Sequence, residues 1–154
     1  MKGRNLDIAT LEAEEARLIL PRFDEAVALQ LGHTLLELAK GLPVVINIRN
    51  AHRTFFHAAL PGSQMNEENW ARRKGNTALM MGHASMLVGL RNAERKRTLA
   101  ANGLSEADYA DHGGAVPIRV SGVGIAAVAT VSGLPQEDDH RLVVKGIEAL
   151  ARFA

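Results

Sequence analysis

The chain has 154 residues, of which 47% are hydrophobic and 23% are charged, and its formal net charge is +1 at pH 7. This length predicts a single domain, residues 1–154, with a full hydrophobic core, and the near-neutral charge argues against nucleic acid or an anionic membrane as a partner. The sequence has no cysteine, which excludes disulfides, thiolate nucleophiles and cysteine metal sites. No long apolar segment opens the chain or could span a bilayer, so we expect a cytoplasmic protein.

The first third of the sequence predicts two helices and a hairpin. Apolar residues recur at roughly helical spacing up to about residue 20, so residues 1–20 are expected to form an N-terminal helix. A clearer amphipathic pattern follows over about 23–39 and ends at Gly41. Apolar and polar residues then alternate over 43–50, and a β-branched and aromatic segment, 54–60, returns as an antiparallel partner.

The remainder predicts two further helices, a second hairpin and a final helix. A helix is expected over about 67–81, with a shorter one beginning at Ser85. Residues 116–120 and 125–132 read as strands joined by a glycine-containing turn. The second of these strands is nearly apolar on both faces, which is typical of a central strand covered on both sides. The pattern therefore predicts an α/β fold whose central sheet is mainly antiparallel.

Several short segments resemble one known family. They are Gly113-Gly114-Ala-Val-Pro117-Ile118, Gly124 to Ala126, and Val131-Ser132-Gly133 with Asp139 after them. They resemble the GlcG/HbpS-like, or haem-degrading domain, family, and the segment from Trp70 to Asn76 is similar to an uncharacterised branch of small proteins in it. This resemblance implies a profilin-like α/β/α sandwich that assembles into homo-oligomers, dimers or larger, and it makes haem a possible cofactor.

The candidate site residues lie in three stretches that this fold could bring together. We expect a cleft for an anionic small molecule, such as a haem propionate, because arginine and lysine suit carboxylates and exposed glycine amides bind anions. Its predicted lining is Trp70, Arg73, Lys74, Asn76, His83, Ser85, His112, Gly113, Gly114, Asp139 and His140. No two histidines have a close metal-binding spacing, so no metal site is predicted.

Other interpretations of the same residues remain open. His112 and Asp139 could form the acid/base pair of an enzyme, provided that the fold brings their side chains within hydrogen-bond reach. The protein could equally have a structural or interaction role without a ligand. In that case Trp70 and its neighbouring cations would form a subunit contact or pair with the acidic first helix. Asp139 would bind backbone amides at a helix N-terminus, and His140 would simply pack.

Overall fold

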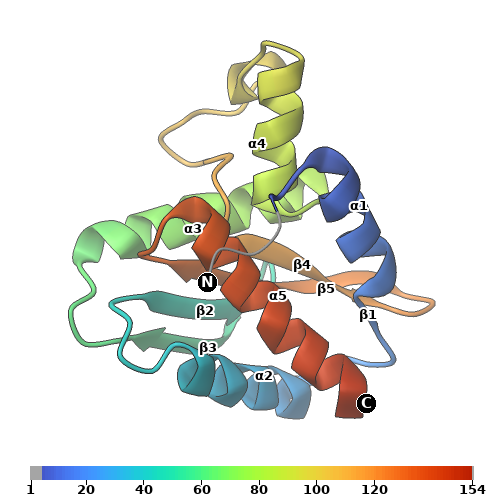
Figure 1. Cartoon of the computed structure of the whole chain (residues 1–154), viewed down its shortest axis with the longest axis vertical. Coiled ribbons are helices and arrows are strands. Elements are labelled where there is room, and N and C mark those ends of the chain that lie inside the picture. The colour runs from blue at the N-terminus through green and yellow to red at the C-terminus, as the bar shows by residue number, and fades with distance from the viewer. Residues whose placement is uncertain (1–4, 154) are drawn as a thin grey trace.

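The computed structural model describes residues 5–153, whose helices and strands form a mixed α/β fold (Figure 1). Within that range the elements in chain order are α1 (Ile8–Arg17), β1 (Ile19–Leu20), α2 (Glu25–Leu38), β2 (Val45–Arg49), β3 (Thr54–Ala59), α3 (Met65–Met81), α4 (Ser85–Glu94), the 3-10 helix η1 (Leu99–Asn102), β4 (Ala115–Val120), β5 (Gly124–Ser132) and α5 (Gln136–Phe153).

The strands form one sheet in the order β1-β4-β5-β2-β3. Each neighbouring pair is antiparallel except β1 and β4, which run parallel. The two predicted hairpins are therefore confirmed, and they join through pairing of β2 with β5. The short parallel strand β1 was not predicted, because two residues are too few to show an alternating pattern.

Helices cover both faces of the sheet, as Figure 1 shows, with α3 on one side and α2 and α5 on the other. Alternate side chains of β5 pack on opposite faces of the sheet. Ala127, Ala129 and Val131 join the main core with α2 and α5, whereas Val128 packs near Ala78 of α3. The central position predicted for this strand is confirmed, and with it the mainly antiparallel α/β sandwich.

The N-terminal helix is shorter than the predicted span of 1–20. α1 begins after Asp7, whose side chain accepts a hydrogen bond of 2.8 Å from the Thr10 amide, and it gives way to β1 before Pro21. Residues 1–4 of that span lie outside the described residues. α1 lies beside α4, which rises from the body of the protein (Figure 1).

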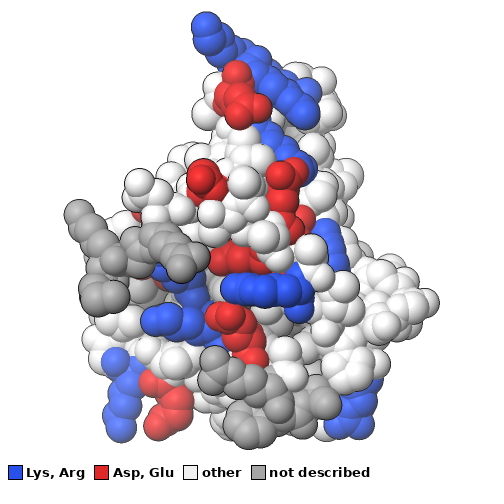
Figure 2. Space-filling view, turned by 45° about the vertical axis from the view of Figure 1, so that its right-hand side comes forward, with Lys and Arg blue, Asp and Glu red and all other residues white. Residues whose placement is uncertain are grey.

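Charged side chains of both signs are mixed on the face shown in Figure 2, also at the free end of α4, where Glu94 is the last helical residue. That end carries the neighbouring cations Arg95, Lys96 and Arg97. None of the helices within residues 5–153 is both long and apolar enough to cross a membrane.

Candidate functional site

A pocket of about 290 Å³ lies between α3, the loop before β4 and the turn that leads from β5 into α5. Four of the predicted site residues line it: Trp70, Lys74, His112 and Asp139. The remaining lining residues are Glu67, Ser132, Gly133, Leu134 and Gln136. The three sequence stretches that were expected to meet therefore do so, at the end of the sheet where β5 runs into α5.

Lys74 forms the floor of this pocket and is 3% exposed. Its Nζ donates to the carbonyl oxygens of Gly113 at 3.0 Å and Val131 at 3.3 Å, and to Asp139 Oδ2 at 3.1 Å. An ammonium group has three N–H donors. All three are used inside the protein, so Lys74 ties α3 to the glycine loop, β5 and α5 and has no donor left for a ligand.

Asp139 completes this buried network from the first turn of α5. Its Oδ1 accepts from the Leu134 amide at 3.0 Å and its Oδ2 from the Gly133 amide at 3.3 Å, as well as from Lys74. Burial raises the pKa of Asp139 to about 6, although the Lys74 ammonium and the two amides pull it down. Burial likewise lowers the pKa of Lys74, against the attraction of Asp139. The predicted bond to backbone amides is confirmed.

The backbone of the glycine loop passes very near this ion pair. Gly114 has φ 139°, a conformation that L side chains rarely adopt. A Cβ at this position would lie 2.4 Å from the Val131 carbonyl oxygen and 2.7 Å from Lys74 Nζ. The amide of Gly113 donates to Gln136 Oε1 at 2.9 Å. Both glycines are buried and neither lines the pocket, so the structure does not expose their amides to an anion as predicted.

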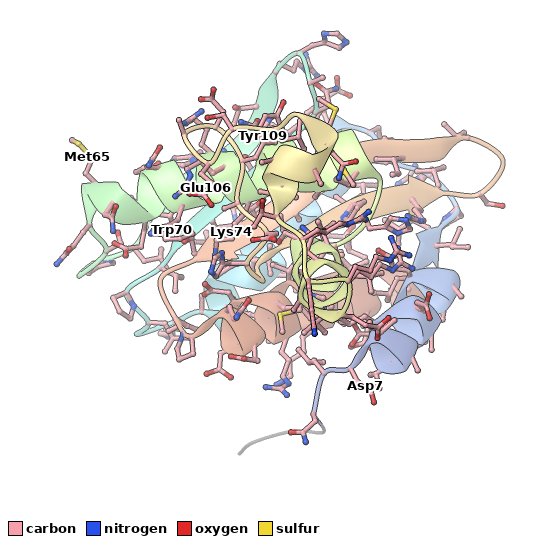
Figure 3. All side chains as sticks on the ribbon, turned by 90° about the horizontal axis from the view of Figure 1, so that it is seen from above. Asp7, Met65, Trp70, Lys74, Glu106 and Tyr109 are labelled. Carbon is pink, nitrogen blue, oxygen red and sulfur yellow. The ribbon has the colours of Figure 1, made fainter. Side chains whose placement is uncertain are left out.

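Trp70 and His112 line the pocket with their rings, and Arg73, which was also predicted to line it, lies over Trp70 outside the lining. The rings of Trp70 and His112 meet edge to face, with centroids 5.1 Å apart. The guanidinium of Arg73 lies 4.5 Å from the Trp70 centroid, and its Nε donates to the Glu106 carbonyl at 2.8 Å. The His112 side chain is 53% exposed, and its Nδ1 faces Asp111 Oδ1 at 3.8 Å. Figure 3 shows Trp70 and Lys74 on α3, with Met65 standing out at the free end of that helix.

Asn76 and Ser85, also predicted to line the cleft, belong to other contacts. Asn76 accepts from Arg49 Nη2 at 2.7 Å and donates to the Asp108 carbonyl at 2.8 Å. Ser85 is buried, and its hydroxyl accepts from the Ala115 amide at 3.1 Å. Asn76 therefore links α3 to β2 and to the segment before β4, and Ser85 links α4 to the start of β4.

His83 and His140 contact α1 instead of the pocket. His83 Nδ1 lies 2.8 Å from Glu15 Oε1, and His140 Nε2 lies 2.8 Å from Glu14 Oε1. The His140 side chain is 1% exposed, and its Nδ1 is buried without a partner among the described residues. Arg119 of β4 also contacts the α3–α4 turn, because its Nη2 donates to the Gly82 carbonyl at 2.6 Å. The acidic residues of α1 therefore bind groups of the sheet, α4, α5 and the α3–α4 turn, not Lys74 or Arg73.

The geometry does not form the predicted acid/base pair of His112 and Asp139. Both side chains line the same pocket, but the carboxylate of Asp139 is taken up by Lys74, Gly133 and Leu134. The imidazole of His112 lies against Trp70 and faces Asp111. The buried partner of Asp139 is therefore a lysine. No group of three or more potential metal ligands lies within residues 5–153.

Glu67 and Gln136 were missed as pocket residues. Each occupies the first turn of its helix, where a side chain is expected to cap the helix. Glu67 does so, accepting from the Gln64 amide at 3.0 Å. Gln136 instead accepts from Gly113 across the pocket. Helical spacing does not predict that either residue lines the pocket. Both do so because the loop before β4 packs against the first turns of α3 and α5.

Comparison with known proteins assigns the family. Residues 23–148 match the family described as "Haem degrading protein HbpS-like". The chain is 44% identical over 147 residues to a UPF0303 protein of Acidobacterium capsulatum, covering 94% of this chain and 89% of that protein. It is 46% identical over 149 residues to a UPF0303 protein of Streptomyces coelicolor, covering 95% and 92%.

Solved structures show the same fold. The crystal structure of the Ybr137w protein superposes with a TM-score of 0.88 at 30% identity, covering 97% of this chain and 90% of that one. A complex named PduOC:Heme gives 0.69 at 21% identity, with coverage of 82% and 94%. HbpS gives 0.68 at 19% identity, with coverage of 84% and 90%. The chain therefore belongs to the HbpS-like family, and it is similar to UPF0303 proteins over most of its length.

Proposed function

We propose that this protein binds a small anionic ligand in the pocket lined by Trp70 and His112, and that haem is the first ligand to test. The observation that carries the proposal is the half-exposed imidazole of His112, set against Trp70 at the rim of the pocket. Arg73 lies over the same indole ring and supplies a cation for a carboxylate. One similar structure is named as a haem complex, which supports haem as a candidate.

The residues at the rim fit haem in their chemistry. A neutral imidazole is a common ligand of haem iron, and the iron would supply redox and oxygen chemistry when bound. Nδ1 of His112 faces the Asp111 carboxylate at 3.8 Å, and Nε2 has no partner within residues 5–153. At 3.8 Å this carboxylate is too far for a hydrogen bond to Nδ1, but a shift to hydrogen-bond distance would let it orient the ring as carboxylates orient metal-binding histidines. His112 would therefore hold the iron and Arg73 a propionate.

The size of the pocket also suits ligands smaller than haem. Ligand pockets usually measure about 300–1,000 Å³, and this one is near 290 Å³. A tetrapyrrole would extend beyond it over Trp70 and Arg73, whereas a small carboxylate would fit inside. Lys74 and Asp139 use their polar atoms to bind each other and the backbone, so they fix the shape of the pocket. Trp70, His112 and Arg73 would then make the contacts with the ligand.

Haem binding is tested by titration of haem into the purified protein while the Soret band is recorded. We expect a shifted band at micromolar haem, retained in His52→Ala and lost or strongly weakened in His112→Ala. His52 is the matched control because it is an exposed histidine in the β2–β3 turn, away from the pocket. No shift at micromolar haem would rule out haem as the ligand.

Smaller ligands can be screened by intrinsic fluorescence. Trp70 is the single tryptophan of the sequence, so its emission reports on this pocket alone. A carboxylate that enters should quench or shift the emission in the wild type and have a weaker effect in Arg73→Gln. If neither haem nor any small carboxylate changes the emission of Trp70, the pocket is not a ligand site.

We also propose that copies of the chain associate into a homo-oligomer. Apolar side chains stand exposed near the β4–β5 turn and at the end of α3: Val123 is 74%, Ile125 38% and Met80 57% exposed. Burying such side chains against a second copy is favourable. Light scattering coupled to gel filtration should give a mass that is a multiple of the chain mass of 16.6 kDa. The double variant Val123→Ser/Ile125→Ser should shift that mass towards the monomer.

A further inference from the structure

A second groove, of about 420 Å³, lies on the other side of the first turns of α3, against strands β2 and β3. It shares no lining residue with the Trp70 pocket. The residues that line it are Asn47, Arg49, His57, Met65, Glu68, Asn69, Ala71 and Arg72. All but two of these side chains are polar or charged, so the groove is suited to a polar ligand.

One wall of the groove is a row of three hydrogen-bonded side chains. Asn47 and His57 are directly opposite each other on β2 and β3, and Asn47 Nδ2 lies 3.0 Å from His57 Nδ1. Because an amide nitrogen can only donate, Nδ1 accepts and the ring proton is on Nε2. Nε2 then donates to Glu68 Oε1 at 2.9 Å. This row occupies both ring nitrogens of His57 and part of the Glu68 carboxylate.

Two arginines also line the groove, Arg49 from β2 and Arg72 from α3. Arg49 Nη2 donates to Asn76 at 2.7 Å and weakly, at 3.4 Å, to the Arg72 carbonyl. Its guanidinium crosses α3 at Gly75, where a Cβ would lie 2.9 Å from Nη2. A glycine inside a helix is destabilising relative to alanine. At this position it leaves room for a cation beside the helix.

Arg72 extends over the groove from the next turn of α3. Its Nη atoms bind Asp108 and Asn69 and the Ala107 carbonyl, at 2.9–3.0 Å. Its Nε, like that of Arg49, has no partner within residues 5–153. Burial and the like charge of Arg72 lower the pKa of Arg49. Both arginines line the groove, and Arg49 Nη2 reaches the backbone carbonyl of Arg72, so an anion between the two side chains would offset their like charges.

We propose that this groove binds a small oxyanion, a carboxylate or a phosphate, between the guanidinium groups of Arg49 and Arg72. Planar guanidinium groups with free N–H donors match the geometry of both anions. Glu68 is the only acidic residue in the lining, and its charge is turned towards His57. Asn47 and Asn69 supply amide groups for the uncharged part of the ligand. Met65, which projects from the first turn of α3 in Figure 3, is exposed and also lines the groove.

The direct test is NMR of the arginine Nε–Hε groups during titration with two probes, inorganic phosphate and succinate, at constant ionic strength set with chloride. Spectra of Arg49→Gln and Arg72→Gln assign the two signals. We expect saturable shifts of both signals in the wild type with one or both probes. Which probe binds more tightly tells whether the natural ligand carries a phosphate or a carboxylate. Absence of saturable shifts with either probe would overturn the proposal.

A calorimetric titration of the variants provides the second measurement. Arg72→Gln should weaken binding about tenfold or more, because a hydrogen bond to a charged group is lost. Arg72 is exposed, and its ion pair with Asp108 contributes little to folding, so this variant should fold normally. The control is Arg95→Gln, an exposed arginine at the end of α4 that lies far along the chain from the groove. Equal weakening in Arg95→Gln would show non-specific screening and overturn the proposal.

Discussion

Lys74 Nζ lies 3.1 Å from Asp139 Oδ2, and the two side chains are only 4% and 2% exposed. This ion pair joins the middle of α3 to the start of α5, which are 65 residues apart in the sequence. Two backbone carbonyls and two backbone amides complete it, so that each charged atom is satisfied. A buried pair of this kind fixes the position of the segments around it, and here those segments are the walls of the Trp70 pocket.

Removal of one partner should be costly. Lys74→Met leaves the Asp139 carboxylate buried without its counter-charge, and breaking a buried pair in this way costs about 3–5 kcal/mol. Urea unfolding should show this loss in the free energy of unfolding. Lys145→Met is the control, because Lys145 is an exposed lysine of α5, and it should change stability by less than about 0.5 kcal/mol.

The double variant Lys74→Met/Asp139→Leu separates the charge from the packing. Each single variant leaves one buried charge, whereas the double variant leaves none, so its cost should be smaller than the sum of the two single costs. If the costs of the single variants simply add, the two side chains do not depend on each other and the ion pair is not the element that fixes the pocket.

The pair should also titrate in an unusual range. Burial raises the pKa of Asp139 to about 6 from an ordinary value of 3.8, so the folded state holds this proton more tightly than the unfolded state. Its contribution to stability is therefore fully present below about pH 4 and is lost as the pH rises through 6. Carbon-13 NMR of the side-chain carboxyl measures the pKa directly. In Lys74→Met the pKa should rise further, since the ammonium holds it down in the wild type.

The sequence alone predicts most of the sheet, because alternation and turn residues mark β2 to β5 and the apolar character of both faces of β5 marks the centre. It does not reveal β1, which pairs with β4 through only two residues, Ile19 and Leu20. Nor does it show where the acidic face of α1 goes. Charges spaced along a helix predict a solvated face equally well, and only the tertiary structure places Glu14 and Glu15 against two histidines.

The candidate site is predictable in part for the same reason. Residue type and position in the chain indicate that Trp70, Lys74, His112 and Asp139 could meet, and they line one pocket. Which of them pair is decided by distances that no spacing encodes. Lys74 forms the ion pair with Asp139. His112 instead contacts the Trp70 ring and lies near the Asp111 carboxylate.

Gly114 should not tolerate a side chain. Its φ of 139° and the 2.4 Å approach of a Cβ to the Val131 carbonyl both oppose Gly114→Ala. We expect a loss of more than about 2 kcal/mol in urea unfolding, because strain in such a backbone region costs about 1–3 kcal/mol before any clash is added. Gly41→Ala is the matched control. Its φ is 82° but a Cβ there meets nothing within 4 Å, so its loss should be the smaller one.

The contact of α1 with the body depends on Glu14. Its carboxylate binds Nε2 of the fully buried His140, whose Nδ1 already lacks a partner, and a charged hydrogen-bond acceptor in this position is worth about 1.5–3 kcal/mol. Glu14→Ala should lower the free energy of unfolding by that amount and increase hydrogen exchange of the α1 amides. Glu12→Ala breaks the more exposed pair with Arg91 and should cost at most about 1 kcal/mol. Equal costs for the two variants would mean that apolar packing, through residues such as Leu11, holds α1 in place, and that the His140 contact adds nothing.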